Sequence, residues 1–241
     1  MPTAINKIVD GLLFPTISLI IGSPNYATIA EVHLKLNSNT PSAQWNLGCG
    51  TLGLLQLTVY PAVYATLSAK SFIAPVNPDT KPTIPSIALV PQITNLRYAH
   101  DAATTVFNEY DCTDKALQKM LIASVNKMFI RSLNHRYMGY GTTTTRTILD
   151  HLYTTYASIS CADLQDNVPK LFTSYDANLP IEAPIDQVKG AVEYSAAGNT
   201  LYTPLQVVGI AFQLIFQTVL FNYNCKLWKL RDPSNKTYTQ F

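Results

Sequence analysis

Apolar residues recur at helical spacing between Asp114 and Tyr156, and this stretch predicts two helices joined by a turn. In the first helix an apolar side chain returns every fourth residue, so these side chains share one flank. They are Leu117, Leu121, Val125, Phe129 and Leu133, with Met128 beside them. The second helix repeats the pattern with Ile148, Leu149, Leu152, Tyr153 and Tyr156. Gly139 and Gly141 favour a turn between the two helices, and the threonines at 142–145 offer hydroxyls for the second N-cap.

Helical patterns also cover most of the chain after residue 93. A first helix is predicted up to Asp111 by Ile93, Leu96, Ala99 or Ala103, Val106, Phe107 and Tyr110. Ser160 is a candidate N-cap for a helix to about Phe172, which Pro169 shortens or kinks. A further helix is predicted over 181–198, with Pro184 in its first turn and Gly198 at its end.

The clearest local signature is Thr203-Pro204-Leu205-Gln206, a capping box with proline at the first helical position. The helix that it opens is predicted to reach about Trp228. It is apolar nearly all round from Leu205 to Phe221, which indicates the central and most buried helix. A membrane span is the alternative, but glutamines interrupt the apolar run and no other segment supports a membrane protein.

The first ninety residues are less regular. Ile8 to Ile21 is an apolar run broken by Pro15, and Asn25 can cap a helix to about Asn37. Leu54–Val59 and Phe72–Val76 have strand character and predict a small β-hairpin, with one helical turn over 61–67 between them. Prolines between 75 and 91 favour an extended connector. The sequence therefore predicts a mainly α protein, with an irregular region over 1–91 and a helical bundle over 92–241.

Composition limits the kinds of partner and ligand that the sequence suggests. Charged residues make up 13% of the 241 residues and the net charge is +2, so no argument for a general polyanion binder follows. The four cysteines, Cys49, Cys112, Cys161 and Cys225, form no Cys-x-x-Cys pair, which argues against zinc. No secretory signal precedes them, so free thiols in a reducing compartment are favoured over disulfides.

Charge is unevenly distributed along the helical half. Six basic residues and one acid lie between 114 and 146, and the basic ones are Lys115, Lys119, Lys127, Arg131, Arg136 and Arg146. Six acids and two lysines lie between 162 and 199. Three interpretations remain open: two solvated faces, complementary faces within or between subunits, or a basic surface that contacts RNA phosphates.

No catalytic motif stands out. The sequence has no Gly-x-Ser-x-Gly elbow, no His-Glu-x-x-His and no complete phosphate loop, and Gly48-Cys49-Gly50 predicts a turn. His151 is interpreted as a packed or capping histidine. Asp163 and Asp166 lie on one helix face, but two carboxylates make a weak cation site. We therefore expect no enzyme, no cofactor, no bound metal and no small-molecule substrate.

An ordered series of segments resembles a known family. It runs from Gly50–Leu55 and FIAPVNPDTKPTIP at 72–85, through DKALQKMLIASV at 114–125, to YSAAGNTLYTPLQVVGIAFQLI at 194–215 and KLWKLRDPSNKTYTQF at 226–241. Together these segments resemble the Gag-like (capsid) region of copia-type LTR retrotransposon polyproteins, as found in diatoms and other algae. The resemblance implies an all-α capsid-type domain that self-assembles around the element's RNA in a cytoplasmic virus-like particle.

Two departures from that family bear on function. The chain lacks the Cys-x₂-Cys-x₄-His-x₄-Cys knuckle that such polyproteins carry further downstream, and it ends at Phe241, where relatives continue. A truncated copy of the polyprotein is therefore one expectation. The alternative function is a domesticated helical module that binds a protein partner without forming particles.

Overall fold

The computed structural model describes residues 4–43, 52–68, 71–79, 81, 84–87, 89–176, 178–180, 182–217, 221–232 and 235–237. The chain divides into two compact units, Met1–Ala157 and Ser158–Phe241. The boundary expected at 91/92 lies instead inside the first unit, at the start of a long helix whose other end enters that unit's core. The described residues form helices and no strand, so the prediction of a mainly α protein is confirmed.

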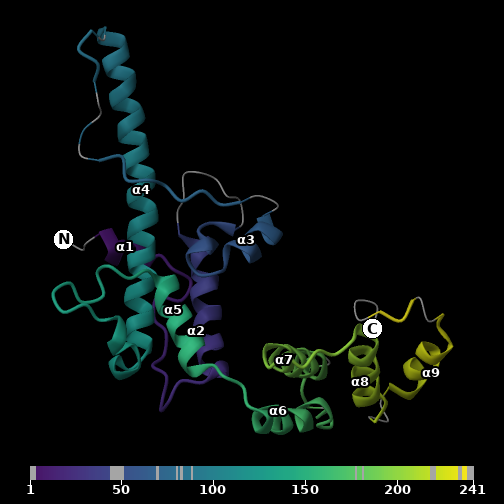
Figure 1. Ribbon diagram of the computed structural model, residues 1–241. Helices are drawn as coiled ribbons and strands as arrows, with labels where there is room; N and C mark the ends of the chain where they lie inside the picture. Colours follow the sequence, from purple (N-terminus) through teal and green to yellow (C-terminus); the bar gives the residue numbers. More distant parts are fainter. Residues whose placement is uncertain are drawn as a thin grey trace. The chain divides into compact units, whose positions relative to one another are not determined.

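Unit 1 is built from five α-helices and three short 3₁₀ segments, within the residues that are described (Figure 1). The α-helices are α1 (Ala4–Asp10), α2 (Tyr26–Asn39), α3 (Pro61–Ser68), α4 (Val90–Ser124) and α5 (Thr145–Tyr156). The 3₁₀ segments are η1 (Thr40–Ser42), η3 (Leu55–Leu57) and η4 (Lys127–Leu133).

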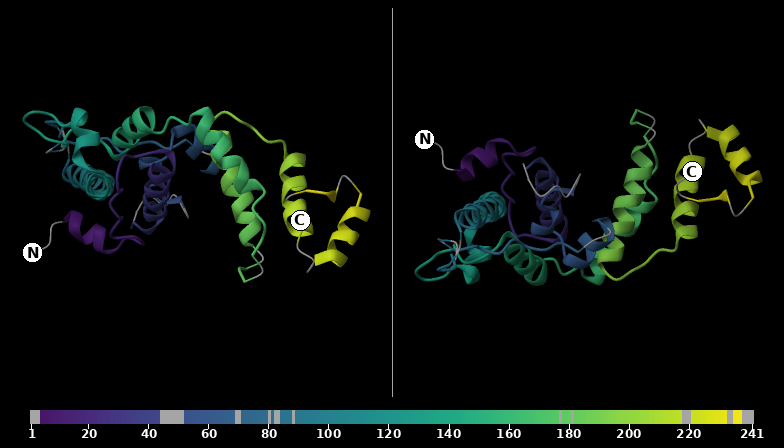
Figure 2. Two further views of the ribbon diagram at one scale, coloured as in Figure 1. Left: turned by 90° about the horizontal axis from the view of Figure 1, so that it is seen from below. Right: turned by 90° about the horizontal axis from the view of Figure 1, so that it is seen from above.

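The core of unit 1 lies where α2, α5 and the second half of α4 meet. Leu36, Leu117 and Leu149 are fully buried there, because the apolar stripes of the three helices face one another. The predicted N-caps are confirmed: the Asn25 side chain accepts from the Thr28 amide, and the Thr144 side chain accepts from the Thr147 amide. Figure 2 views α4 nearly along its axis and shows α1 beside it.

Helix α4 differs from the prediction in both its length and its end. It is one helix of 35 residues, roughly 52 Å long, where two were expected. No glycine or proline interrupts the junction, and the Lys115 ammonium pairs with the Asp111 carboxylate one turn away. The helix was expected to continue to Leu133, but it ends at Ser124. The next residue, Val125, is extended, and the Asn126 side chain caps η4 by accepting from the Met128 amide.

The predicted β-hairpin is wrong. Leu55–Leu57 is a 3₁₀ turn, and residues 71–79 are extended without a partner strand among the described residues. The prolines near the second segment remove backbone donors that a strand pairing would need. Gly53 has φ +49°, and a Cβ there would lie 2.6 Å from the Thr40 carbonyl oxygen, so this position requires glycine.

Unit 2 contains α6 (Cys161–Asn167), η5 (Val168–Leu171), α7 (Ala183–Ala197), α8 (Pro204–Phe216) and α9 (Asn222–Leu230). Ser160 caps α6, and the prediction that Pro169 shortens this helix is confirmed, because η5 begins at Val168. Pro184 lies in the first turn of α7 and Gly198 follows its last residue, also as predicted.

The capping box at Thr203 is confirmed, but α8 is neither as long nor as buried as expected. It ends at Phe216, and α9 begins at Asn222 beyond residues 218–220, which lie outside the described part. The Leu205 side chain is 74% exposed. Unit 2 has too few helices to surround α8, so its core is small: Leu171, Val188, Ala191 and Leu214.

Among the described residues, no helix is both long enough and apolar enough to span a membrane. Trp45 and the turn predicted at Gly48-Cys49-Gly50 lie outside the described residues.

Candidate functional site

Residues 115–149 contain no aspartate or glutamate but hold all six of the predicted contact residues. We call this stretch the acid-free segment. It comprises the last ten residues of α4, η4, the connecting turn and the first part of α5. The structure separates its six cations into two groups, according to whether a carboxylate of unit 1 pairs with them.

Two of the six cations have such partners. The Lys115 ammonium lies 2.9 Å from both carboxylate oxygens of Asp111. The Arg146 guanidinium lies 3.3 Å from the centre of the Tyr60 ring, and its Nε is 3.0 Å from the Asp150 carboxylate. Its Nη1 also donates to the Thr58 carbonyl, so Arg146 ties α5 to the segment before α3. Both residues therefore have structural partners and are poorly suited to bind an external anion.

The other four cations are exposed. Lys119 lies on α4, and its ammonium donates to the Asn6 side chain of α1 at 3.0 Å. Lys127 and Arg131 lie on η4, and Arg136 lies in the turn after it. We call Lys127, Arg131 and Arg136 the cationic triplet. The three side chains come from one continuous stretch of ten residues and form no ion pair within the described part of the chain.

The turn that carries Arg136 has a defined backbone. His135 and Gly139 each donate an amide hydrogen to the other's carbonyl oxygen at 2.9 Å. Gly139 has φ +59°, a conformation that other residues rarely adopt. The His135 Nδ1 accepts from the amides of Tyr137 and Met138 at 3.3 Å. This arrangement holds Arg136, Tyr137 and Met138 at the apex of a loop that projects from unit 1 between η4 and α5 (Figure 1).

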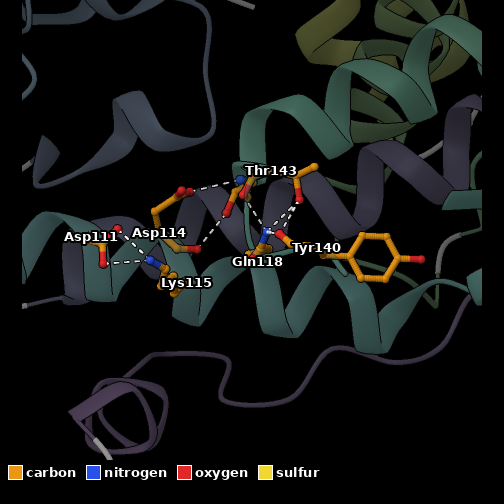
Figure 3. Close-up of polar contacts among 7 residues, drawn as sticks. Asp111, Asp114, Lys115, Gln118, Tyr140 and Thr143 are labelled. Carbon is orange, nitrogen blue, oxygen red and sulfur yellow. Dashed lines mark hydrogen bonds and ion pairs between the residues drawn. The ribbon is translucent and has the colours of Figure 1, made fainter. Parts of the chain in front are cut away.

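Side chains of α4 anchor the base of this loop (Figure 3). The Gln118 amide lies 2.8 Å from the Tyr140 carbonyl oxygen and 2.6 Å from that of Thr143. The Asp114 carboxylate accepts from the Thr145 amide at 3.1 Å, and the Thr145 hydroxyl donates to the Asp114 carbonyl. Burial raises the pKa of Asp114, while the hydrogen bonds from Thr145 and the nearby Lys115 oppose that rise. The C-terminal side of the loop is therefore anchored to α4 before any partner arrives.

The apex combines positive charge with an aromatic face. The Tyr137 side chain is 81% exposed, and the Arg136 guanidinium lies 5.4 Å from its ring centre. Cations next to exposed rings suit the backbone and bases of single-stranded nucleic acid, since phosphate binds the cation and a base stacks on the ring. Met128, predicted inside the first helix, is 67% exposed on η4 because the helix has ended before it.

The histidines have structural partners. The His33 Nδ1 lies 3.0 Å from the Tyr153 hydroxyl and its Nε2 lies 2.9 Å from the Thr58 carbonyl oxygen. Burial lowers the pKa of His33 and raises that of Tyr153 to about 12, so neither group is tuned to exchange protons near neutral pH. The His151 Nε2 lies 3.0 Å from the Phe129 carbonyl oxygen, which confirms its interpretation as a packed histidine.

The thiols and acidic pairs show no second site. Cys112, Cys161 and Cys225 are free thiols, and burial raises the pKa of Cys112 and of Cys225. Cys49 lies outside the described residues. The Asp163 carboxylate is engaged by the Ser160 amide and hydroxyl in the capping box of α6. No group of three or more His, Cys, Asp or Glu within the described ranges is placed to hold a metal ion.

No protein-family model, no curated protein and no solved structure matches this chain. The assignment of the site therefore rests on the geometry of its residues. Sequence reasoning found the cations but missed the exposed Tyr137 and Met138. The signal was present: two glycines close together after a basic aromatic pair, Arg136-Tyr137, predict a tight turn that presents that pair.

Proposed function

We propose that this chain is a Gag-like structural protein of a copia-type LTR retrotransposon. It would associate with copies of itself into a cytoplasmic virus-like particle and package the element's RNA. The series of segments between residues 50 and 241 that resembles this family supports the proposal, as does the mainly helical fold. In this proposal the protein is structural and catalyses no reaction.

The observation that carries the assembly proposal is the uncovered first half of α4. From Val90 to about Ala103 the helix extends beyond the core, and the extended segment 71–79 touches it through His100. Apolar side chains remain exposed on segment 71–79, on α4 and on the residues just before α4: Ile73, Val76, Ile87, Leu89, Val90 and Tyr98. Apolar side chains are unfavourably solvated in water, and an exposed group of them is typical of a protein interface. Weak contacts repeated over many copies then suffice to hold a particle together.

The cationic triplet supports the RNA part of the proposal. Lys127, Arg131 and Arg136 are exposed, and the Tyr137 ring at the apex offers a stacking surface. Binding through phosphate contacts should weaken steeply with salt, by a logarithmic slope of roughly −0.7 for each contact with a single strand.

Size-exclusion chromatography with light scattering tests assembly, and fluorescence anisotropy with a single-stranded RNA tests binding. We expect species larger than a monomer at high protein concentration, and RNA binding that weakens on changing the cationic triplet to glutamate. Changing Lys7, Lys81 and Lys226 to glutamate is the matched control, because it alters net charge equally at exposed positions elsewhere. A strictly monomeric chain with and without RNA would contradict the proposal. Equal loss of RNA binding in both variants would contradict the assignment of the cationic triplet as the RNA contact.

The alternative is a domesticated interaction module, and a groove of about 200 Å³ beside α8 and α9 favours it. Leu205, Val208, Phe212 and Trp228 line this groove, and such a surface suits the apolar side of a partner helix. A gene whose reading frame lacks protease, integrase and reverse-transcriptase sequence downstream would support the module over the capsid protein.

A further inference from the structure

The loop apex has the properties of a binding hot spot. Arg136 and Tyr137 are exposed side by side, and arginine and tyrosine are among the residues that most often dominate interface energies. The paired hydrogen bonds between His135 and Gly139 fix the backbone that presents them. A rigid loop loses little conformational entropy when it binds, so more of its contact energy appears as affinity.

Unit 2 holds a groove of suitable size between η5 and α7. Its volume is about 350 Å³, and Lys170, Gln187, Gly190 and Tyr194 are among its lining residues. Gln187 donates to the carbonyl oxygens of Lys170 and Thr173, which holds the two walls in place. A Cβ at Gly190 would meet no heavy atom within 4 Å, so the groove is open above this residue.

The loop apex is basic, and the α7 edge of the groove is acidic. Lys170 lines the opposite wall of the groove, where its ammonium lies 5.7 Å from the centre of the Tyr194 ring. Asp186 lies one turn before Gly190 on α7 and Glu193 lies one turn after it, so both carboxylates flank the open position. All six acids between 162 and 199 are exposed, and the described residues of unit 2 form no ion pair with them. The loop apex belongs to the acid-free segment, so that segment has no carboxylate that would repel the acidic edge of the groove.

We propose that Tyr137 of one copy enters the η5–α7 groove of a second copy, with Arg136 beside Asp186 and Glu193. This inference rests on the proposed self-assembly and assigns it a contact. Each chain carries both the apex and the groove, so the contact is heterologous and can repeat from copy to copy. The groove then replaces RNA as the partner of both Arg136 and Tyr137, while Lys127 and Arg131 stay available to phosphate.

Charge exchange between two variants tests the contact. Arg136→Glu alters the apex, and the double change Asp186→Lys with Glu193→Lys alters the groove. Each variant alone should self-associate roughly tenfold to hundredfold more weakly in analytical ultracentrifugation without RNA. Mixing the two should restore assembly, because the acidic apex of one then meets the basic groove of the other. If Arg136→Glu acted only by weakening RNA binding, mixing would not restore assembly, because mixing returns no cation to the altered apex.

A second pair of variants avoids charge altogether. Gly190→Leu should fill the groove and weaken assembly to a similar degree, whereas Ala162→Leu, at an exposed position of α6 outside both grooves, should not. Gly190 lies within α7 and has open space at the Cβ position, so both changes should leave the fold intact by circular dichroism. If the wild type assembles and the variants assemble equally well, the contact is overturned and the proposed function stands. The same conclusion follows if mixing the two variants fails to restore assembly. A monomeric wild type would overturn both. Rescue only when both changes lie in one chain would indicate docking within a chain and overturn the second copy as occupant.

Discussion

The two units differ most in how much apolar surface each encloses. In unit 1, three helices and the apolar stretch after α1 bury a large cluster, from Leu12 and Ile20 to Leu152. In unit 2, the corresponding cluster has four members within the described residues, and part of its interior is polar: the Asn167 amide donates to the Ala191 carbonyl oxygen and to the Ser195 hydroxyl. Hydrophobic stabilisation grows with buried apolar area. Unit 1 should therefore be the more stable unit, and unit 2 should depend more on local helix signals and on partners.

Removing one large side chain from each core should give the largest effects. Leu149→Ala should lower the free energy of unfolding of unit 1 by about 2–5 kcal/mol, because it loses buried contacts and leaves a cavity. Leu214→Ala should unfold unit 2 under conditions where unit 1 remains folded, since its core has little else to lose. Hydrogen exchange read by mass spectrometry follows the two units separately.

Leu205→Ala is the matched control, because this side chain is largely exposed on the same helix as Leu214. It should change the exchange rates little. Equal protection of both units after Leu149→Ala and Leu214→Ala would show that the difference in core size has no bearing on stability.

Loss of a helix cap should matter more in the unit with the smaller core. Thr203 accepts from the Gln206 amide and Gln206 reaches back to the Thr203 amide, so Thr203→Ala should cost about 1 kcal/mol. In unit 2 this should appear as faster exchange across α8. Thr144→Ala removes the corresponding cap from α5, but core packing should confine its effect to the first turn. A larger spread of exchange in α5 than in α8 would contradict the comparison.

The smallest expected effect is a pH dependence of unit 1 alone. Burial lowers the pKa of His33 from its ordinary value of 6.5. A base whose pKa is lowered on folding binds a proton more weakly in the folded state than in the unfolded state. Its contribution to stability is therefore lost as pH falls through 6.5 toward the folded pKa. Unit 1 should lose stability in urea between about pH 7.5 and about pH 5.5. His33→Gln cannot titrate and should flatten this dependence; an unchanged slope would assign it to another group.

Local signals made several elements predictable. Asn25, Thr144, Ser160 and Thr203 each cap a helix through a contact with the residue three positions further on, and the sequence displays such a pair directly. The sequence did not show where a tertiary or capping contact would override the local preference for helix or strand. The fourfold apolar repeat continued past Ser124, but the capping of η4 by Asn126 ended the helix, and the strand character of 72–76 found no pairing partner among the described residues.

The site was predictable in part for the same reason. The Lys115 partner, Asp111, lies one turn away and could have been anticipated from spacing. Arg146 could not, since its contacts with Thr58 and Tyr60 join residues more than eighty positions apart. The exposure of Tyr137 depends on Gly139 adopting a positive φ, which a glycine permits but does not require.

The lack of carboxylates in residues 115–149 has a consequence for how partners can be released. No carboxylate of this segment competes with an external anion for its cations, so a bound anion is released only when other ions screen the attraction. If RNA and a second copy bind as proposed, concentrated salt should strip both from the protein.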